Sequence, residues 1–396
     1  MINYENALDI ILDESKAIPF KTELINLNNS LGRIITEDVY SDVNLPPFTN
    51  SAMDGYAYKF SDGIDNYKIV GEITAGNFKY IPINEGECVL ITTGSKIPDS
   101  CDTVVPVEDV KIEGENIHLE KFIPKFSNLR FKAEDIEINK LAVQKYNKIS
   151  TQLIPILATC GKAQVNVLKK LKIGFLTSGN ELIDISEKPE NDKIRASNQY
   201  ALMAQIVKAG CEPVSFGRVV DNSDELQRKL VEMLNSDCNI LITTGGVSVG
   251  KYDLQKDIMQ DLGIEFKFWK SNIKPGKPIV FGTFRKEKLV FGLPGNPLSS
   301  YIGFEIFVKP VINEYSHENS TNKLYAILEN DLKKKDGKRH FKIGVMRNID
   351  GINYVNNQLG HGSGNVYQMS LANCLAIMPE DEKFIPKGEK VECIMI

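Results

Sequence analysis

Short apolar runs alternate with amphipathic stretches along residues 170–315, and this alternation predicts strands separated by helices. Apolar runs bounded by turn residues are typical of buried strands, whereas apolar positions repeating every three or four residues are typical of helices. The predicted strands begin at Lys172, Val214, Asn239 and Leu289, and the predicted helices span 198–209, 224–234, 253–262 and 298–311. Strands that alternate with helices predict a parallel sheet with helices on both faces.

Two other parts of the chain, about 46–140 and about 320–396, consist of short β-rich runs bounded by Gly and Pro. In the second of these, Asp336-Gly337 stands between two apolar runs and predicts a β-hairpin that joins residues 324–328 to residues 341–343. The basic run 333–339 would then be the solvated tip of this hairpin, with an anion-binding role as the alternative.

The segments 1–45 and 141–168 are predicted to be mainly helical. Apolar residues at helical spacing indicate a first helix around residues 7–12 and a second near 29–38, and a third should run from Ser150 to Gly161. A chain of 396 residues exceeds what a single hydrophobic core supports. We therefore predict four regions, namely 1–45 with 141–168, 46–140, 169–316 and 320–396.

Composition narrows the class of protein. The net charge is −5, from 47 basic and 52 acidic residues, which argues against a nucleic-acid partner but leaves room for a local basic pocket that binds an anion. The seven cysteines include no C-x-x-C pair, which disfavours a disulfide framework and a zinc finger and fits a reducing compartment. No segment has the pattern of a signal peptide or a membrane-spanning helix. We expect a soluble, cytoplasmic protein with no membrane partner.

Three of the predicted strands end in turns of small residues, at 177–181, 243–250 and 292–300. In a parallel sheet these turns fall on one edge, at the carboxyl ends of the strands, where α/β proteins bind ligands. Glycine there lets backbone N–H groups approach a phosphate closely. The alternative is that glycine only makes the turns tight, but three such turns on one edge favour a ligand site. The turns match neither G-x-G-x-x-G nor G-x-x-x-x-G-K-S/T, which disfavours a standard dinucleotide site and a P-loop.

Charged residues on loops supply the candidate chemistry. Lys274-Pro275-Gly276-Lys277-Pro278 holds two cations on a stiff frame that suits an anion, although a solvated loop is the alternative. Four carboxylates stand on loops or helix starts, where oxygen ligands near a phosphate suggest Mg²⁺: Asp54, Asp135, Glu181 and Asp253. Each acid alone is as readily a helix cap or a surface residue. The four histidines are dispersed, which disfavours a histidine metal site or a Ser-His pair.

Asp54 stands out because it lies in a segment of small residues, directly before Gly55 and shortly after the Pro46-Pro47 turn. A carboxylate held by such tight backbone geometry on a loop is typical of a functional group, although a turn Asp that bonds its own backbone is the alternative.

The Asp54 segment, the three turns of small residues and the Lys-Pro-Gly-Lys-Pro loop resemble the motifs of the molybdopterin molybdenumtransferase family. The C-terminal domain of gephyrin is related to this family. The resemblance is collinear over nearly the whole chain. One departure is Asn180, where many members carry Asp; Asn loses the charge, so no acid role is expected at 180. The matching pieces are Pro47-Phe48, Asn50-Ser51-Ala52-Met53-Asp54-Gly55-Tyr56, Ala75-Gly76, Thr92-Thr93-Gly94-Ser95 with Pro98, Glu134-Asp135, Ser178-Gly179-Asn180-Glu181-Leu182, residues 245–250 with Asp253, residues 274–278, Leu293-Pro294-Gly295-Asn296-Pro297, Gly362-Ser363-Gly364 and Ala372-Asn373.

This resemblance implies a multidomain α/β plus β fold. It would comprise a three-layer αβα molybdopterin-binding domain, a β-rich N-terminal domain with a helical linker region, and a C-terminal β-barrel-like domain. The resemblance also implies a homodimer, in which Asp54 of one subunit meets the glycine-rich edge of the other. A separate adenylating enzyme and apo-molybdoenzymes are implied as candidate partners.

The implied activity is Mg²⁺-dependent insertion of molybdate into adenylated molybdopterin, which releases AMP and the molybdenum cofactor. Molybdate and tungstate stay open as the oxyanion. The implied catalytic residues are Asp54, Thr93, Asp135, Glu181 and Asp253, of which Asp54, Glu181 and Asp253 would hold the metal. The implied cofactor-binding residues are Ser178, Gly179, Gly245, Gly246, Ser248, Gly250, Lys274, Lys277, Pro294, Gly295, Asn296, Pro297 and Ser299. The alternatives are an anchoring scaffold on the same fold and a pterin nucleotide hydrolase that needs no molybdate.

Overall fold

Two units make up the computed structural model of this chain: Met1–Glu23 with Leu168–Ile396, and Leu24–Val167. The structure describes residues 1–396 except 221, 247–253, 319–323 and 360–364. Among the described residues, no helix is long and apolar enough to cross a membrane.

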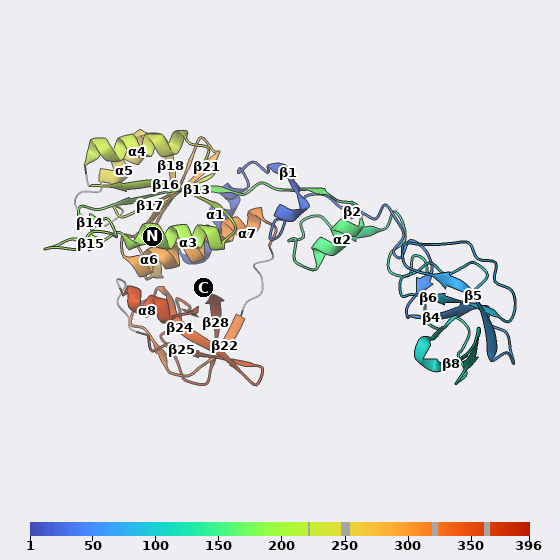
Figure 1. The fold of residues 1–396 in the computed structure, drawn as a ribbon. Coiled ribbons are helices and arrows are strands. Elements are labelled where there is room, and N and C mark those ends of the chain that lie inside the picture. The colour runs from blue at the N-terminus through green and yellow to red at the C-terminus, as the bar shows by residue number, and fades with distance from the viewer. Residues whose placement is uncertain (221, 247–253, 319–323, 360–364) are drawn as a thin grey trace. The chain divides into compact units, whose positions relative to one another are not determined.

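The first unit contains a six-stranded sheet flanked by helices (Figure 1). Its strand order is β16 (Glu212–Val219), β13 (Lys172–Ser178), β17 (Ile240–Thr244), β21 (Lys288–Leu293), β20 (Val280–Phe284) and β18 (Ile264–Trp269). The first four strands are parallel, as the sequence predicts, but β20 runs antiparallel to both of its neighbours, β21 and β18. The expectation of a wholly parallel sheet is therefore wrong at this edge. Residues 264–269 alternate apolar and polar side chains, as expected of an edge strand half exposed to solvent.

Helices cover both faces of this sheet and give three layers. Figure 1 shows α4 and α5 on one face and α3 and α6 on the other. The helices of this unit are α1 (Tyr4–Ser15), α3 (Ser197–Lys208), α4 (Ser223–Asn235), α5 (Leu254–Asp261), α6 (Pro297–Gly303), the π-helical η3 (Phe304–Val308), α7 (Lys309–Tyr315) and α8 (Val366–Leu371). The predicted helix 298–311 thus exists but contains a π-helical segment, which widens the turn at its centre.

Successive side chains along each buried strand pack into two separate hydrophobic cores, one on each face of the sheet. Phe175 of β13 packs on the face of α1, α6 and α7, whereas the next residue, Leu176, packs beneath α4. In β17, Ile240 and Ile242 join the first core and Leu241 joins the second. This period of two is what a pleated strand buried on both faces requires.

The C-terminal part of the first unit is a closed barrel. The neighbouring strands are β24 (Arg339–Ile349), β25 (Ile352–Asn356), β22 (Leu324–Leu328), β28 (Lys390–Met395) and β26 (Cys374–Met378), and β26 pairs back onto β24. Closure leaves no free edge. The predicted hairpin around Asp336-Gly337 is wrong, because β22 pairs with β25 and β28, whereas β24 pairs with β25 and β26.

The barrel and the αβα domain share one hydrophobic core. Phe341, Ile343, Leu375 and Ile377 lie on the outer side of β24 and β26 and pack in the same cluster as α1 and α7. In addition, β19 (Ile273–Lys274) pairs in parallel with the start of β24. The loop that follows β19 is thereby held against the barrel. The short pairs β14 (Leu182–Ile183) with β15 (Ile194–Arg195) and β23 (Leu332–Lys333) with β27 (Phe384–Ile385) complete this unit.

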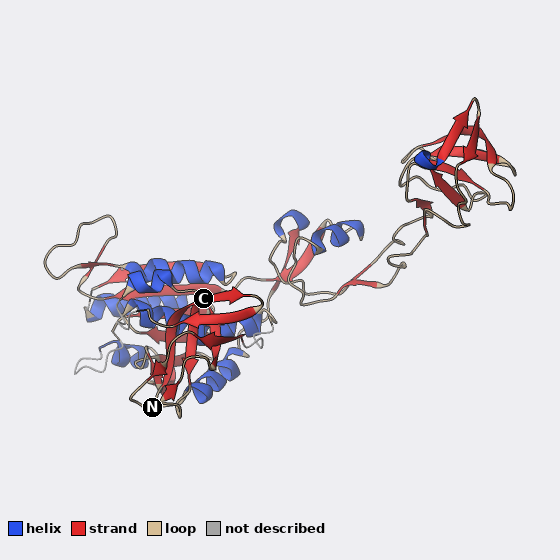
Figure 2. Cartoon of the chain, turned by 90° about the horizontal axis from the view of Figure 1, so that it is seen from below, coloured by secondary structure: helices blue, strands red, loops and turns tan. Residues whose placement is uncertain are grey.

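The second unit is dominated by strands, and Figure 2 shows how few helices the strand-rich parts of the chain contain. Its main sheet has the order β7 (Thr103–Pro106), β4 (Gly55–Tyr58), β6 (Glu87–Ile91), β5 (Asn66–Ile73), β9 (Asn116–Leu119) and β8 (Val110–Glu113). Around it lie η2 (Val107–Asp109) and the pair β3 (Asn50–Ser51) with β10 (Leu129–Arg130). This sheet confirms the prediction of a β-rich region there.

The remainder of this unit is less helical than predicted. It contains η1 (Leu27–Asn29), β2 (Val39–Tyr40), β11 (Leu141–Val143) and α2 (Leu153–Thr159), with β1 (Thr22–Asn26) paired to β12 (Gln164–Leu168). The helix predicted near 29–38 is wrong, because Ile34 and Ile35 form β-bridges to Lys148 and Val167. Ile35 is buried in the core that β11, α2 and β12 form in this part of the unit, and this burial outweighs the helical spacing of the sequence.

Candidate functional site

Three glycine-rich turns meet at the carboxyl edge of the parallel strands. The N–H of Gly245 after β17 donates to the carbonyl of Leu293 at the end of β21 (3.2 Å). A Cβ on Gly245 would lie 2.3 Å from the carbonyl oxygen of Ser178, and one on Gly295 would lie 3.5 Å from the Gly245 Cα. With a φ of +86°, Gly245 also adopts a backbone conformation that L side chains rarely take. The predicted juxtaposition of the turns is confirmed.

Glu181 lies at this edge, as expected. Its carboxylate folds back over Gly179, where an added Cβ would lie 2.6 Å from Oε2. The Glu181 side chain is exposed, and its backbone carbonyl accepts a hydrogen bond from the N–H of Ile194 (2.8 Å). The carboxylate is thus available at the turn after β13. The candidates Ser248, Gly250 and Asp253, together with the matched segment 362–364, lie outside the described residues.

A cavity of about 630 Å³ opens beside the third turn, between the αβα domain and the barrel. Its lining includes Lys274 and Lys277, as well as Pro294, Asn296 and Ser299. Pro297 begins α6 directly after Asn296. The structure therefore places the predicted Lys-Pro-Gly-Lys-Pro loop and the predicted Pro-Gly-Asn-Pro turn on one cavity.

The sequence did not place the other wall of this cavity, although anion binding was the alternative for the run 333–339. This wall is formed by the barrel residues Lys333, Lys334, Lys335, Asp336, Lys338, His340 and Lys342. The run 333–338 carries four lysines in six residues, and this density was the available signal for an anion site. Assigning the run to a solvated hairpin tip is therefore wrong, and the anion-binding alternative gains support.

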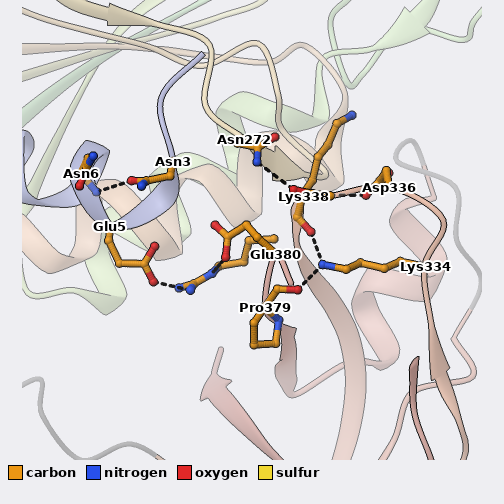
Figure 3. Close-up of polar contacts among 11 residues, drawn as sticks. Asn3, Glu5, Asn6, Asn272, Lys334, Asp336, Lys338, Pro379 and Glu380 are labelled. Atoms are coloured by element: carbon orange, nitrogen blue, oxygen red, sulfur yellow. Dashed lines mark hydrogen bonds and ion pairs between the residues drawn. The ribbon is translucent and has the colours of Figure 1, made fainter. Parts of the chain in front are cut away.

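Buried contacts hold this lysine loop in place, as Figure 3 shows. Lys334 is only 7% exposed, and its ammonium donates to the carbonyls of Lys338 (2.6 Å) and Pro379. The amide of Asn272 donates to the Gly337 carbonyl (2.9 Å). A buried ammonium that bonds backbone carbonyls fixes the loop without neutralising its positive charge.

Arg339 anchors the end of the loop. Its guanidinium forms ion pairs with Glu5 of α1 and with Glu380 (3.0 Å to the latter), and it stacks over the Tyr4 ring at 5.0 Å. A planar guanidinium suits such combined pairing and stacking. The lysine wall is thus fastened to the N-terminal helix.

The cavity is electrostatically suited to an anion. Burial lowers the pKa of Lys342 and of Lys334, and for Lys342 the nearby positive charge of Lys274 lowers it further. Crowded, partly buried ammonium groups are stabilised when an anion arrives. The described lining of the cavity also contains one carboxylate, that of Asp336. Its Oδ1 lies 2.7 Å from Nε2 of His340, and its Oδ2 lies 3.6 Å from Nζ of Lys274.

In the second unit, Asp54 and Thr93 lie together. Asp54 occupies the turn between β3 and β4, and its Oδ1 accepts hydrogen bonds from the backbone N–H (2.7 Å) and the hydroxyl (2.9 Å) of Thr93. These two bonds, the backbone one first, lower the pKa of Asp54 below its ordinary value of 3.8. The following Gly55 has no room for a side chain, because a Cβ would lie 2.0 Å from the Val105 carbonyl oxygen. The turn therefore presents an ionised, exposed carboxylate.

Asp135 has a different partner. It forms an ion pair with Arg130 (2.6 Å), and its backbone N–H donates to the Leu45 carbonyl (2.8 Å). Within the part of the chain that is described, no hydrogen bond joins Asp135 to Asp54. Asp135 therefore fastens the strand before the Asp54 turn, and a catalytic role for it stays a prediction.

The predicted Mg²⁺ ligands do not form a cluster among the described residues, where no group of three or more His, Cys, Asp or Glu side chains could hold a metal ion. Asp54 and Glu181 belong to different units, and Asp253 lies outside the described residues. Mg²⁺ therefore stays a prediction, and no step proposed below depends on it.

The chain thus combines a three-layer αβα domain, which has glycine turns at its carboxyl edge, with a barrel, and a lysine-lined cavity lies between them. This arrangement is typical of an α/β protein with a site suited to an anionic ligand. Family models narrow this class. The model described as the MoeA N-terminal region (domain I and II) matches residues 2–161, the probable molybdopterin binding domain matches 174–314, and the MoeA C-terminal region (domain IV) matches 325–396.

Individual relatives cover nearly the whole chain. It is 30% identical to the molybdopterin molybdenumtransferase of Haemophilus influenzae, over 96% of this chain and 95% of the relative. It is 31% identical to that of a Nostoc species, over 93% and 88% of the two chains. The crystal structure of the molybdopterin biosynthesis moeA protein from Pyrococcus horikoshii superposes with a TM-score of 0.83 at 27% identity and covers 100% of both chains.

The chain therefore belongs to the molybdopterin molybdenumtransferase family. This confirms the resemblance drawn from its motifs, the multidomain fold that the resemblance implies, and an enzymatic role in molybdenum cofactor biosynthesis.

Proposed function

We propose that this chain binds molybdate in the lysine-lined cavity and inserts it into adenylated molybdopterin, with release of AMP and the molybdenum cofactor. The observation that carries the proposal is the cavity itself, whose described lining includes seven lysines and one carboxylate. A volume of about 630 Å³ lies within the ~300–1,000 Å³ typical of ligand sites. It accommodates a tetrahedral oxyanion together with part of a larger anionic ligand.

The two substrates, the oxyanion and the adenylated pterin, would be bound by different groups of the protein. Lys274 and Lys277 bind the oxyanion by charge-assisted hydrogen bonds, since ammonium groups suit oxygen anions that need no fixed planar geometry. The phosphates of the adenylated pterin would lie along the glycine edge, where the turns that contain Gly179, Gly245 and Gly295 meet at the carboxyl ends of the parallel strands. The shared turn at residues 294–299 joins these two subsites.

Asp54 supplies the ionised group for the chemical step. The hydrogen bonds from Thr93 lower its pKa, so the carboxylate is ionised at neutral pH and can orient the attacking water during cleavage of the phosphoanhydride. Water attacks a phosphorus atom of the anhydride, the bridging P–O bond breaks, AMP leaves, and the pterin keeps its own phosphate. Glu181 would position the same phosphates from the sheet edge. If bound there, Mg²⁺ would polarise the anhydride, held by Asp54, Glu181 and Asp253.

We further propose that the enzyme works as a cytoplasmic homodimer, in which Asp54 of the partner subunit completes the glycine edge. The family resemblance supports this arrangement. The seven free, buried cysteines fit a reducing compartment. An adenylating enzyme would supply the substrate, and apo-molybdoenzymes would receive the product.

AMP release from purified protein tests the proposal. The protein is given adenylated molybdopterin and Mg²⁺, with and without molybdate, beside Asp54→Ala and the double variant Lys274→Met/Lys277→Met. We expect AMP release that requires molybdate and is lost in both variants. Release without molybdate would indicate a pterin nucleotide hydrolase, and no release from the folded wild type would favour the scaffold.

A further inference from the structure

One negative charge stands within the lysine cavity, although the site attracts anions. Among the described residues that line the cavity, Asp336 is the only Asp or Glu, against seven lysines. A carboxylate there weakens the attraction for any bound anion. Its presence calls for a role other than simple anion binding.

Asp336 is fixed in position. Its Oδ1 faces Nε2 of His340 at 2.7 Å and accepts a hydrogen bond from the backbone N–H of Lys338 at 3.2 Å. His340 is itself only 5% exposed. The Lys338 carbonyl is bonded in turn by the buried Lys334, so the turn that presents Asp336 is held from both sides (Figure 3).

The remaining oxygen of Asp336 faces the cavity. Oδ2 lies 3.6 Å from Nζ of Lys274, a distance at which the two charges attract directly. Burial raises the pKa of Asp336, but the hydrogen bonds from His340 and Lys338 outweigh it and lower the pKa overall. The carboxylate is therefore ionised, and it already pairs with Lys274, one of the cations that would bind the ligand.

We propose that Asp336 is an internal counter-ion of the oxyanion site, which holds Lys274 in the empty cavity and limits the affinity for the bound oxyanion. An incoming dianion must compete with Asp336 for the Lys274 ammonium. Holding the ground state too tightly does not accelerate transfer, so limited affinity leaves the oxyanion free to move to the sulfur atoms of the pterin. This inference rests on the proposed function, because it requires an oxyanion to bind beside Lys274.

Asp336→Asn isolates the charge. Asn keeps an oxygen that accepts from His340 and Lys338, so the turn is retained. We expect molybdate to bind about tenfold more tightly, measured by isothermal titration calorimetry, because a repulsive charge is removed from the site. Perrhenate is also tetrahedral but carries a single charge, and its affinity should rise only about threefold, because Coulomb energy is proportional to ligand charge. Unchanged or weaker molybdate binding overturns the inference, as does an equal gain for both ions.

Two variants separate charge from structure. Asp350→Asn makes the same substitution at the exposed turn between β24 and β25, outside the cavity lining, and should leave both affinities unchanged. His340→Gln removes the partner of Asp336 but keeps the carboxylate, so molybdate affinity should not rise. A rise in either variant equal to that of Asp336→Asn overturns the inference. If His340→Gln does not fold, the inference is still tested by Asp336→Asn, through the gain in molybdate affinity relative to the gain in perrhenate affinity.

The same titrations separate this inference from the proposed function. If wild type binds no molybdate, or binds it equally well after Lys274→Met/Lys277→Met, the proposed oxyanion site is wrong and the counter-ion role fails with it. If wild-type binding depends on the lysines but Asp336→Asn binds no more tightly, only the counter-ion role is overturned.

Discussion

The Asp54 turn and the lysine cavity both concentrate charge, but they are built differently. Asp54 is satisfied within its own unit by two neutral donors of Thr93, which stabilise the charged form. In the cavity, burial disfavours the charged forms of Lys334 and Lys342. The protein itself thus stabilises the charge of Asp54, whereas the charges of the cavity lysines would be stabilised by a bound anion.

This difference assigns the two regions different tasks. The Asp54 carboxylate is ionised and exposed, so it repels an anion but can orient a reacting group. Lysines that crowd one another gain most when an anion arrives. We therefore assign turnover to the Asp54 turn and oxyanion binding to the cavity, and the following predictions test that division.

The largest effect is expected for Asp54→Asn. It should lower the rate of AMP release by about 10²–10⁴-fold, the range for loss of a positioned acid-base group, and leave molybdate affinity unchanged. Quenched-flow assays of AMP and calorimetric titration with molybdate measure the two quantities. A loss of molybdate binding comparable to the loss of rate would show that the two regions do not divide the work.

An intermediate effect is expected at the glycine edge. Gly245→Ala adds a Cβ 2.3 Å from the Ser178 carbonyl oxygen at a φ of +86°, so it should destabilise the αβα domain by ~2–4 kcal/mol. Gly210→Ala is the matched control, since its φ is +77° but nothing lies within 4 Å of the added Cβ. It should cost only ~1–2 kcal/mol.

Urea unfolding followed by the fluorescence of Trp269 checks this pair of variants. Trp269 is the one tryptophan of the chain and lies in β18 of the same sheet, so it reports on this domain. Equal destabilisation by the two substitutions would mean that the close packing of the turns after β13 and β17 contributes nothing to stability.

The smallest effect concerns the pKa of Asp54. Thr93→Val removes the hydroxyl donor and keeps the backbone donor, so the pKa should rise part of the way toward 3.8. The stabilisation from a lowered folded-state pKa is present above pH 3.8 and is lost as the pH falls through the folded value. The variant should therefore lose part of it at neutral pH. A carboxyl-carbon NMR titration gives the pKa, and an unchanged value would assign the shift to the backbone N–H alone.

The Asp54 turn and the lysine cavity also differ in how far the sequence could predict them. Asp54, Gly55 and the Gly245 turn depend on short contiguous motifs, so their local geometry follows from residue types and spacing. The Lys274 loop was also recognisable, but its opposite wall was not. His340 reaches the cavity because β24 pairs with β19 and β26, and Lys334 reaches it because β23 pairs with β27. Such long-range pairing leaves no local pattern.

The fold shows the same limit. Strands β13, β17 and β21 were predictable because they are buried on both faces and read as apolar runs. Ile34 and Ile35 carry helical spacing but form β-bridges instead, because the distant residues Lys148 and Val167 pair with them. The closed barrel likewise depends on the pairing of β24 with β26, which joins residues that are 30 to 38 positions apart.

A crystal structure of the protein with tungstate, located by its anomalous scattering, tests the central claim most directly. Tungstate matches molybdate in charge and shape and scatters strongly. We predict a single strong anomalous peak within hydrogen-bonding distance of Lys274 and Lys277, in the cavity lined by Lys342. A peak at the Asp54 turn instead, or an empty cavity at saturating tungstate, would contradict the assignment of oxyanion binding to the lysine cavity.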